Sequence, residues 1–294
     1  MTSSFDHQAS DQRIGSYPPI LLISTTDGRG DRIAMLQRMV ASVARFRDVT
    51  GAPVRLLLLR QCAEDGSIDL PSWVEVSEVT GHLPLSVARN RLIESVTVAA
   101  DAVVAFPDDD AWYPDGALEH IVRQFQTQPT LDFWFCRYAS APVAVDPMRE
   151  RKPVLQDVLR EASSNTIVVR GRVLNAIGGF DPELGVGARL GSAEDTDFAI
   201  RAFGEARLSR MLDAPAIGHR DRNIAMRARY YRGALVTIIR HARAVPGGRK
   251  AALRKVAVGV ALTATRSMSV RDFRQAMREA AAAWRQAPRS GPAA

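Results

Sequence analysis

Three adjacent carboxylates, Asp108, Asp109 and Asp110, directly follow a short apolar run at residues 102–106. Neighbouring carboxylates repel one another and raise each other's pKa unless a cation lies between them. Oxygen ligands of this kind suit Mg²⁺ or Mn²⁺, which proteins often share with the phosphates of a substrate. One Asp could instead cap the helix that we expect from Pro114. Because a cap needs a single Asp, the triplet favours a metal site.

A second acidic group, Glu194, Asp195 and Asp197, stands at the start of a predicted helix, behind the glycine-rich segment 185–191. Carboxylates favour helix N-termini through the helix dipole, so a purely structural role explains them equally well. The functional interpretation is a general base beside a mobile substrate loop. His219 stands alone at the end of a predicted strand, where a structural role is the commoner one.

These residues must be positioned by strands that alternate with helices. Short apolar runs predict strands, and apolar residues at helical spacing predict the helices between them. We expect strands at 19–24, 54–59, 73–79, 102–106, 131–136, 166–169 and 207–211, and helices at 31–46, 86–99, from 114, and at 194–203. The alternation predicts an α/β protein with a mostly parallel sheet. In such sheets ligands bind at the carboxyl ends of the strands, where the acidic groups stand.

Beyond the last strand of the body, at 216–219, the sequence predicts three helices, at 226–244, 248–265 and 270–286. We therefore divide the chain into a disordered lead-in (1–17), an α/β body (18–220) and a helical C-terminal region (221–294). Segment 139–163 has little periodicity and is expected to be a loop with a short helix.

Composition and charge bound the function. The 294 residues are 46% hydrophobic and 24% charged, which excludes global disorder, collagen and a disulfide scaffold. The net charge of +7 conceals a split, since residues 1–219 carry −7 and the chain from Arg220 onward carries +14. Such a tail indicates an anionic partner or a solvated helical face. No nucleic-acid-binding module is evident, so a membrane surface is the favoured anionic partner.

Three features of the sequence bear on where the protein works in the cell. Cys62 and Cys136 lie in strand-like apolar runs. A single disulfide between them is one interpretation, but buried free thiols, as in a reducing compartment, are the expected one. Residues 1–17 lack the apolar core of a signal peptide, and the apolar run 256–264 is about half the length that spans a bilayer. The expected location is the cytoplasm, with peripheral attachment to the inner face of the cell membrane as an option.

Several short motifs occur in a characteristic order. They are Ser24-Thr25-Thr26, Glu64-Asp65-Gly66-Ser67, Ala88-Arg89-Asn90, Asp108-Asp109-Asp110, Gly178-Gly179-Phe180-Asp181, Glu194-Asp195-Thr196-Asp197 and Gly218-His219. In this order and spacing, over residues 18–220, the sequence resembles the family 2 glycosyltransferases. The resemblance implies a GT-A fold, with a Rossmann-like, mostly parallel central sheet flanked by helices and followed here by a helical C-terminal extension.

The resemblance also implies a donor site for a UDP-, GDP- or dTDP-linked sugar. Thr26 and Asp65, with Glu64 as a near alternative, would lie beside the nucleotide base. Arg89 and Asn90 would lie near the diphosphate. The triplet matches the family's DxD element, so Asp108 and Asp109 would contact the donor nucleotide. Asp110, with His219, would bind Mn²⁺ or Mg²⁺.

On the acceptor side, Asp195 matches the aspartate that acts as general base in inverting members, with Glu194 beside it. Trp112 and Asp197 are candidate sugar or acceptor contacts, although Trp112 fits a core position equally well. The implied reaction moves a sugar to a hydroxyl of a glycan or lipid-linked acceptor, as in bacterial surface polysaccharide or glycolipid biosynthesis. Oligomerisation is left open.

Some features depart from the family or allow other functions. Pro107 stands where many members have an acidic residue, and no Gln-x-x-Arg-Trp segment follows the base, which argues against a processive synthase. A sugar nucleotidyltransferase would use a glycine-rich basic loop after the first strand, faintly matched by Gly28-Arg29-Gly30. An inactive nucleotide-sugar-binding protein is the third interpretation, and intact Asp110 and Asp195 argue against it.

Overall fold

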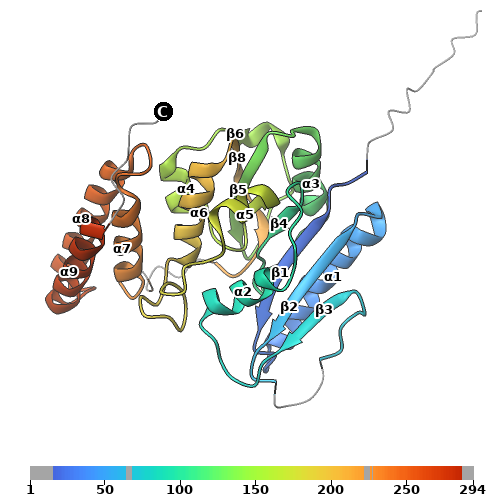
Figure 1. Ribbon diagram of the computed structural model, residues 1–294, viewed down its shortest axis with the longest axis horizontal. Helices are drawn as coiled ribbons and strands as arrows, with labels where there is room; N and C mark the ends of the chain where they lie inside the picture. Colours follow the sequence, from blue (N-terminus) through green and yellow to red (C-terminus); the bar gives the residue numbers. More distant parts are fainter. Residues whose placement is uncertain (1–15, 64–67, 222–225, 227, 287–294) are drawn as a thin grey trace, which may run out of the picture.

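A computed structural model describes residues 16–63, 68–221, 226 and 228–286 (Figure 1). Their centre is an eight-stranded sheet in the order β3-β2-β1-β4-β7-β5-β8-β6. The strands are β1 (Ile20–Thr26), β2 (Val54–Arg60), β3 (Val74–Glu78), β4 (Val103–Ala105), β5 (Leu131–Ala139), β6 (Glu150–Arg151), β7 (Val168–Arg170) and β8 (Leu208–Gly218). Only β6 and β7 of this sheet run against their neighbours. The predicted mostly parallel α/β sheet is confirmed.

Helices cover both faces of the sheet (Figure 1). They are α1 (Arg32–Thr50), α2 (Leu85–Glu94), α3 (Ala117–Thr127), α4 (Leu155–Glu161), α5 (Gly171–Ile177) and α6 (Glu194–Glu205), with a short 3-10 helix, η1 (Pro147–Arg149). Leu56 and Leu58 of β2 face one apolar core, and Leu57 and Leu59 face the other. Because side chains alternate along a strand, a strand buried on both faces needs an unbroken apolar run, which explains the sequence of β2.

Several elements differ from their predicted bounds. The expected strands at 207–211 and 216–219 form one strand, β8, which continues past Pro215. Its pairing with β5 is irregular beside this proline, where Arg137 is opposite Pro215, because proline has no N–H for the ladder. Helix α2 ends at Glu94 rather than near residue 99, and α5 is an additional short helix.

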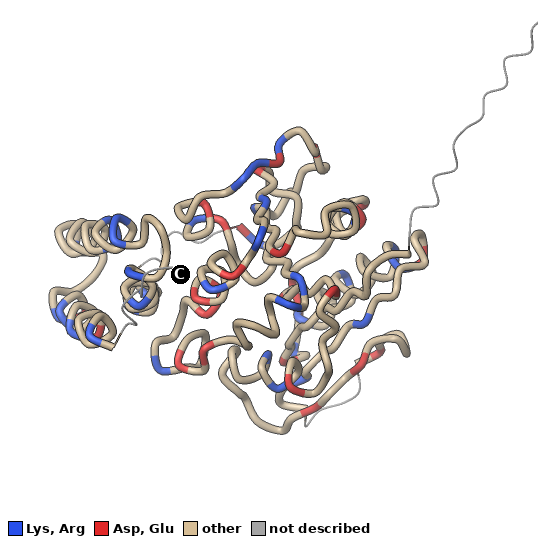
Figure 2. Tube along the Cα trace, turned by 45° about the horizontal axis from the view of Figure 1, so that its top comes forward, with Lys and Arg blue, Asp and Glu red and all other residues tan. Residues whose placement is uncertain are grey.

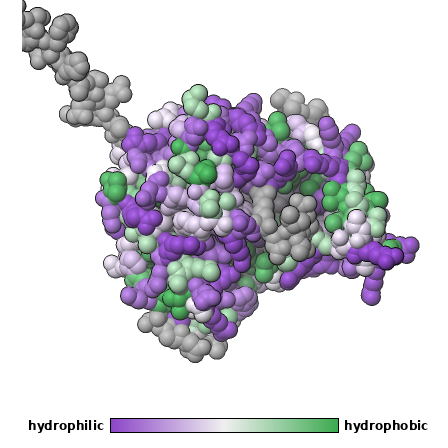
Figure 3. Space-filling view, turned by 180° about the vertical axis from the view of Figure 1, so that it is seen from behind, coloured by the Kyte–Doolittle hydropathy of each residue, from purple (hydrophilic) through white to green (hydrophobic). Residues whose placement is uncertain are grey.

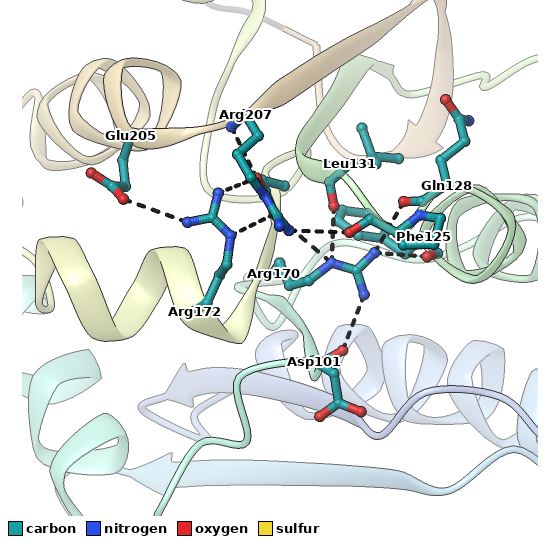
Figure 4. Close-up of polar contacts among 10 residues, drawn as sticks. Asp101, Phe125, Gln128, Leu131, Arg170, Arg172, Glu205 and Arg207 are labelled. Carbon is teal, nitrogen blue, oxygen red and sulfur yellow. Dashed lines mark hydrogen bonds and ion pairs between the residues drawn. The ribbon is translucent and has the colours of Figure 1, made fainter.

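At the amino ends of β5 and β8, opposite the acidic loops, the buried Asp132 carboxylate holds several elements together. Figure 4 shows the arginines of this cluster, Arg170, Arg172 and Arg207. It pairs with Arg172 of α5 and accepts hydrogen bonds from the Arg207 side chain at 2.9 and 3.0 Å. Burial alone would raise the pKa of Asp132, but Arg207 and Arg172 outweigh it and lower the pKa to about 2. Arg170 of β7 donates to the backbone oxygens of Leu131 and other nearby residues. No sequence motif marks this cluster.

The C-terminal helices are α7 (Tyr231–His241), α8 (Gly248–Ala264) and α9 (Val270–Gln286). Helix α7 contacts α6 of the body, where His241 Nε2 lies 2.8 Å from Asp197 Oδ1. Arg240 pairs with Asp181 and Glu183 at 2.5 and 2.9 Å.

Helices α8 and α9 pack on α7, and Figure 2 shows Lys and Arg with few acidic residues along them. Among the helices that the structure describes, none is long and apolar enough to cross a bilayer.

The remaining expectations concern thiols and the N-terminus. Cys62 and Cys136 are both free, as expected, but only Cys136 is buried, whereas Cys62 is partly exposed. The predicted disordered lead-in falls largely outside the described residues, as does Asp65 with its neighbour Glu64.

Candidate functional site

A pocket of about 480 Å³ opens at the carboxyl ends of β1, β4, β5 and β8. Its lining residues come from these strand ends, from the N-terminus of α6 and from the start of α7. They include Thr25, Thr26, Asp27, Arg32, Gln61, His82, Asp108, Asp109, Asp110, Tyr138, Asn165, Glu194, Asp195, His219, Arg220, Tyr230 and Ala234. The fold thus gathers both acidic groups and His219, although more than 100 positions of sequence separate the triplet from His219.

Asp108, Asp110 and His219 form the candidate metal centre, with one ligand atom of each lying within 4.8 Å of the others. His219 Nε2 lies 3.0 Å from Asp110 Oδ1 and 3.8 Å from Asp108 Oδ2. His219 Nδ1 lies 3.0 Å from the Arg220 carbonyl oxygen, so it donates there and leaves the Nε2 lone pair facing the carboxylates.

These donor atoms fit a divalent cation. Asp110 Oδ1 and His219 Nε2 are buried and have no partner with hydrogen-bond geometry among the described residues. Such atoms are costly unless a proton or a metal ion satisfies them. Without an ion, burial alone would lower the pKa of His219, but Asp110 and Asp108 outweigh it and raise the pKa. Burial likewise raises the pKa of Asp110, but His219 and Arg220 outweigh it and leave the pKa lowered. Carboxylate and imidazole ligands suit Mn²⁺, and carboxylates suit Mg²⁺.

Asp108 is held in place by two neighbours. The buried Arg89 of α2 donates to Asp108 Oδ1 at 2.6 Å. Asn165, from the loop before β7, accepts from the Asp108 backbone N–H at 2.7 Å and donates to Oδ2 at 3.0 Å. Arg89 does not line the pocket, so it acts on the site through Asp108. Asn165 was not predicted, because nothing in the sequence of its loop sets it apart.

Asp109 points to the first strand. Its Oδ2 accepts a hydrogen bond of 2.6 Å from Thr26 at the end of β1, and its Oδ1 pairs with Arg32 of α1. Burial raises the pKa of Asp109, and the Thr26 hydroxyl and Arg32 offset this only in part. Asp109 therefore joins β1, α1 and the triplet, and places Thr26 in the pocket wall.

Glu194 and Asp195 begin α6 and line the same pocket. Burial and the adjacent Asp195 raise the pKa of Glu194 to about 7. Burial also raises the pKa of Asp195, although the Thr196 backbone N–H donates to its Oδ1 at 2.7 Å. Gly185 lies against Glu194 at a φ of +97°, where an added Cβ would come within 3.2 Å of the carboxyl carbon. Raised pKa values of this kind are what a general base that works near neutral pH requires.

Besides Arg89, three other predicted site residues lie outside this pocket. Asn90 Oδ1 and Nδ2 bond the backbone of Phe180 at 2.7 Å each, which fixes the turn before the glycine-rich segment. Asp197 points away from the pocket, toward Arg201 and His241, at 2.7 and 2.8 Å. The structure therefore gives Asn90 and Asp197 positioning roles and brings neither to the pocket.

Trp112 is the third of these predicted site residues outside the pocket. Its ring lies over the Gly218 backbone, where an added Cβ would come within 2.0 Å of it, and Arg38 stacks on it at 3.6 Å from the ring centroid. Trp112 is absent from the pocket lining, so the structure places it as a support for the end of β8. The pocket residues Tyr230 and Ala234, from the C-terminal region, were not predicted because no motif marks them.

Comparisons with known proteins give a structural match only. No protein-family model and no curated protein matches the chain. Among solved structures, S. aureus TarS 1–349 in complex with UDP-GlcNAc matches with a TM-score of 0.56 and 16% identity, over 75% of this chain and 66% of that one. The chain has a GT-A-like glycosyltransferase fold.

A second structure supports the same conclusion over more of the chain. The mannosyltransferase PcManGT from Pyrobaculum calidifontis, in complex with GDP-Man and Mn²⁺, matches with a TM-score of 0.52 and 17% identity, over 95% of this chain and 78% of that one. The chain spans 65% of the length of TarS 1–349 and 40% of that of TarS. The predicted GT-A fold is confirmed.

Proposed function

We propose that the protein is a metal-dependent glycosyltransferase of the family 2 type that moves a sugar from a nucleotide-sugar donor to an acceptor hydroxyl with inversion. One observation carries the proposal. The buried atoms Asp110 Oδ1 and His219 Nε2, with no hydrogen-bond partner among the described residues, share a pocket with the acidic pair Glu194–Asp195. A cation site beside a proton acceptor is what transfer from a nucleoside diphosphate needs.

The donor side is formed by the ends of β1 and β4. Thr26 and Asp108 would contact the nucleoside, and Asp110 and His219 would hold Mn²⁺ or Mg²⁺ beside the diphosphate. When bound, the metal neutralises the charge that develops on the leaving phosphate oxygens. The fold neighbours were solved with UDP-GlcNAc and with GDP-Man and Mn²⁺, which favours a UDP- or GDP-sugar over a dTDP-sugar.

Asp195 would act as the general base. As the acceptor oxygen forms a bond to the anomeric carbon, its proton passes to the Asp195 carboxylate, and the bond between that carbon and the diphosphate oxygen breaks. The nucleoside diphosphate then leaves with the electron pair. A single displacement inverts the anomeric centre and needs no covalent intermediate. Glu194 tunes this base, because its charge raises the proton affinity of the pair.

The rival functions account for fewer residues. Nucleotidyl transfer would use the loop after β1, where the Gly28 N–H donates to Thr26 Oγ1 at 3.0 Å. It gives no role to the Glu194–Asp195 pair or to His219. An inactive binding protein would have no use for an acidic pair whose pKa values are raised toward neutrality.

A donor screen tests the proposal. The protein is incubated with UDP-, GDP- and dTDP-sugars and Mn²⁺ or Mg²⁺, without an acceptor, and released nucleoside diphosphate is measured. We expect slow hydrolysis of one donor class, lost in Asp110→Asn and kept in Asp115→Asn, whose carboxylate lies nearby in the sequence but is 89% exposed. Consumption of a nucleoside triphosphate and a sugar phosphate, with release of pyrophosphate, would instead identify a nucleotidyltransferase.

We also propose that the protein acts at the inner face of a membrane, on a glycan or lipid-linked acceptor. Leu253, Ala257, Val260 and Ala264 recur at helical spacing on one exposed face of α8, with Leu253 73% and Val260 54% exposed. Arg249 and Lys250 precede this stripe on the same face. Figure 3 shows hydrophobic surface on the side where the C-terminal helices lie. An apolar stripe with basic residues at its end fits an anionic lipid surface.

A further inference from the structure

A second cavity, of about 900 Å³, adjoins the candidate active site. It lies between α4 of the body and helices α7 and α8. Five residues line both cavities: Tyr138, His219, Arg220, Tyr230 and Ala234. The two spaces therefore meet beside the candidate metal ligand His219, and we name the second one the C-terminal groove.

One part of the lining of the C-terminal groove is apolar. It is formed by side chains from all three helices, namely Leu159, Ile238, Ala251, Val258 and Leu262. Val258 is 39% exposed, so this apolar surface is open to a ligand rather than closed as a core. On α8, these groove residues lie on a different face from the exposed stripe that begins at Leu253.

Four basic side chains also line the groove, namely Arg160 of α4, Arg254 and Lys255 of α8, and Arg220. Asp221 is the acidic side chain among the described lining residues, and its carboxylate already accepts hydrogen bonds of 2.9 and 2.7 Å from Ser140. The groove therefore carries a net positive charge beside an apolar surface.

We propose that the C-terminal groove is the acceptor subsite and takes acceptors that join a phosphate group to an apolar chain. This rests on the proposed glycosyl transfer, because the groove meets the pocket that holds Asp195 beside His219, and an acceptor hydroxyl must reach that pocket. A neutral glycan would leave the apolar part of the groove unused, and a neutral lipid would make no use of its basic side chains. Arginine and lysine bind phosphate, and apolar side chains bury a hydrocarbon chain.

Decyl phosphate, below its critical micelle concentration, is the probe. Binding to the full-length protein is measured by calorimetry in metal-free buffer, so that the phosphate cannot bind through a metal ion. We expect inorganic phosphate and decanol each to bind at least about tenfold more weakly than decyl phosphate. Arg254→Glu removes a cation and adds a repelling charge, so it should weaken decyl phosphate binding about tenfold or more.

Two matched pairs of variants locate the site. Lys250→Glu makes the same charge change one turn earlier on α8, outside the groove lining, and should change affinity by less than about twofold. Val258→Asp should weaken binding, whereas Val260→Asp, on the outer face of the same helix, should not. The proposal would be overturned if the two variants of either pair lost the same affinity for decyl phosphate. It would also be overturned if inorganic phosphate and decyl phosphate bound with equal affinity.

The donor assignment is followed separately. Stabilisation of the Arg254→Glu variant by a nucleoside diphosphate with Mn²⁺ reports on the donor pocket alone. If a nucleoside diphosphate with Mn²⁺ stabilises neither the wild type nor the variant, the proposed function fails. If both proteins are stabilised but the variant binds decyl phosphate as tightly as the wild type, only the assignment of the acceptor subsite is wrong.

Discussion

His219 Nε2 and Asp110 Oδ1 lie 3.0 Å apart, and neither atom has a partner with hydrogen-bond geometry among the described residues. Since His219 Nδ1 donates to the Arg220 carbonyl, a neutral imidazole presents a lone pair to a carboxylate oxygen. Two electron-rich atoms at this distance repel each other unless a proton or a metal ion is shared between them, and a divalent cation would satisfy both. This relationship is the basis of the first prediction.

Mn²⁺ with UDP or GDP should stabilise the wild-type protein. Binding contributes RT ln(1 + [L]/Kd), about 2.7 kcal/mol at a ligand concentration of 100 Kd, so the melting temperature should rise by several degrees. Asp110→Asn and His219→Gln should lose the shift, because each removes a proposed metal ligand. Asp115→Asn is the control and should keep it. The donor site is misplaced if no nucleoside diphosphate shifts the melting temperature of the wild type.

The acidic pair on α6 should control the pH dependence of transfer. Because the pKa of Glu194 is raised to about 7, the pair holds a proton below that pH, and the transfer rate should increase as the pH rises through about 7. Asp195→Asn should keep nucleotide binding and lose about 10²- to 10⁴-fold in rate. Glu194→Gln removes a neighbouring negative charge, so the rising limb should move to lower pH. Full activity of Asp195→Asn would exclude it as the base.

Ionisation of Glu194 should lower the stability of the fold. Most carboxylates have a pKa that is lowered on folding, and their ionisation has the opposite effect. A pKa raised on folding means that the folded state binds the proton more tightly, so Glu194 destabilises the fold as the pH rises from its unfolded pKa toward about 7. Glu194→Gln should therefore raise the melting temperature at pH 8 more than at pH 5. An equal change at both pH values would show that packing, and not ionisation, is responsible.

Asp132 should stabilise the fold strongly at neutral pH. Its pKa is lowered to about 2, so its contribution is complete above about pH 4 and is lost as the pH falls toward 2. Asp132→Asn leaves Arg172 and Arg207 without a buried countercharge and should cost about 3–5 kcal/mol in urea unfolding at pH 7. Asp213→Asn, which removes partly exposed ion pairs with Arg137 and Arg151, should cost about 1 kcal/mol or less. Equal costs for the two variants would contradict this role.

The exposed stripe of α8 should bind anionic membranes. Leu253→Glu and Val260→Glu should each reduce co-sedimentation with phosphatidylglycerol-containing vesicles about tenfold or more, because each loses apolar contact and adds repulsion. Val49→Glu, at an 80% exposed position on α1, serves as the control and should bind like the wild type. Binding that does not respond to either α8 variant would place the membrane contact elsewhere or remove it.

Local patterns in the sequence determined most of the fold. The unbroken apolar run of β2 requires burial on both faces, and the alternation of strands with helices requires a layered α/β sheet. Each acidic motif follows a strand or opens a helix, so its place at the carboxyl edge of the sheet could be predicted. The uneven distribution of charge along the chain likewise distinguishes the acidic body from the basic tail.

Only the tertiary structure decided which side chains meet. Asn165 and Asp108 are 57 positions apart, and no periodicity relates them; the pairing of β4 with β7 in the sheet brings them within hydrogen-bond distance. Asp197 has the same local surroundings as Asp195, but the direction of its side chain on α6 turns it toward His241 of α7 and away from the pocket. A strand or helix fixes its own periodicity through local backbone geometry. The partners of its side chains depend on long-range packing, which is why Tyr230 of the tail reaches the candidate active-site pocket although no motif marks it.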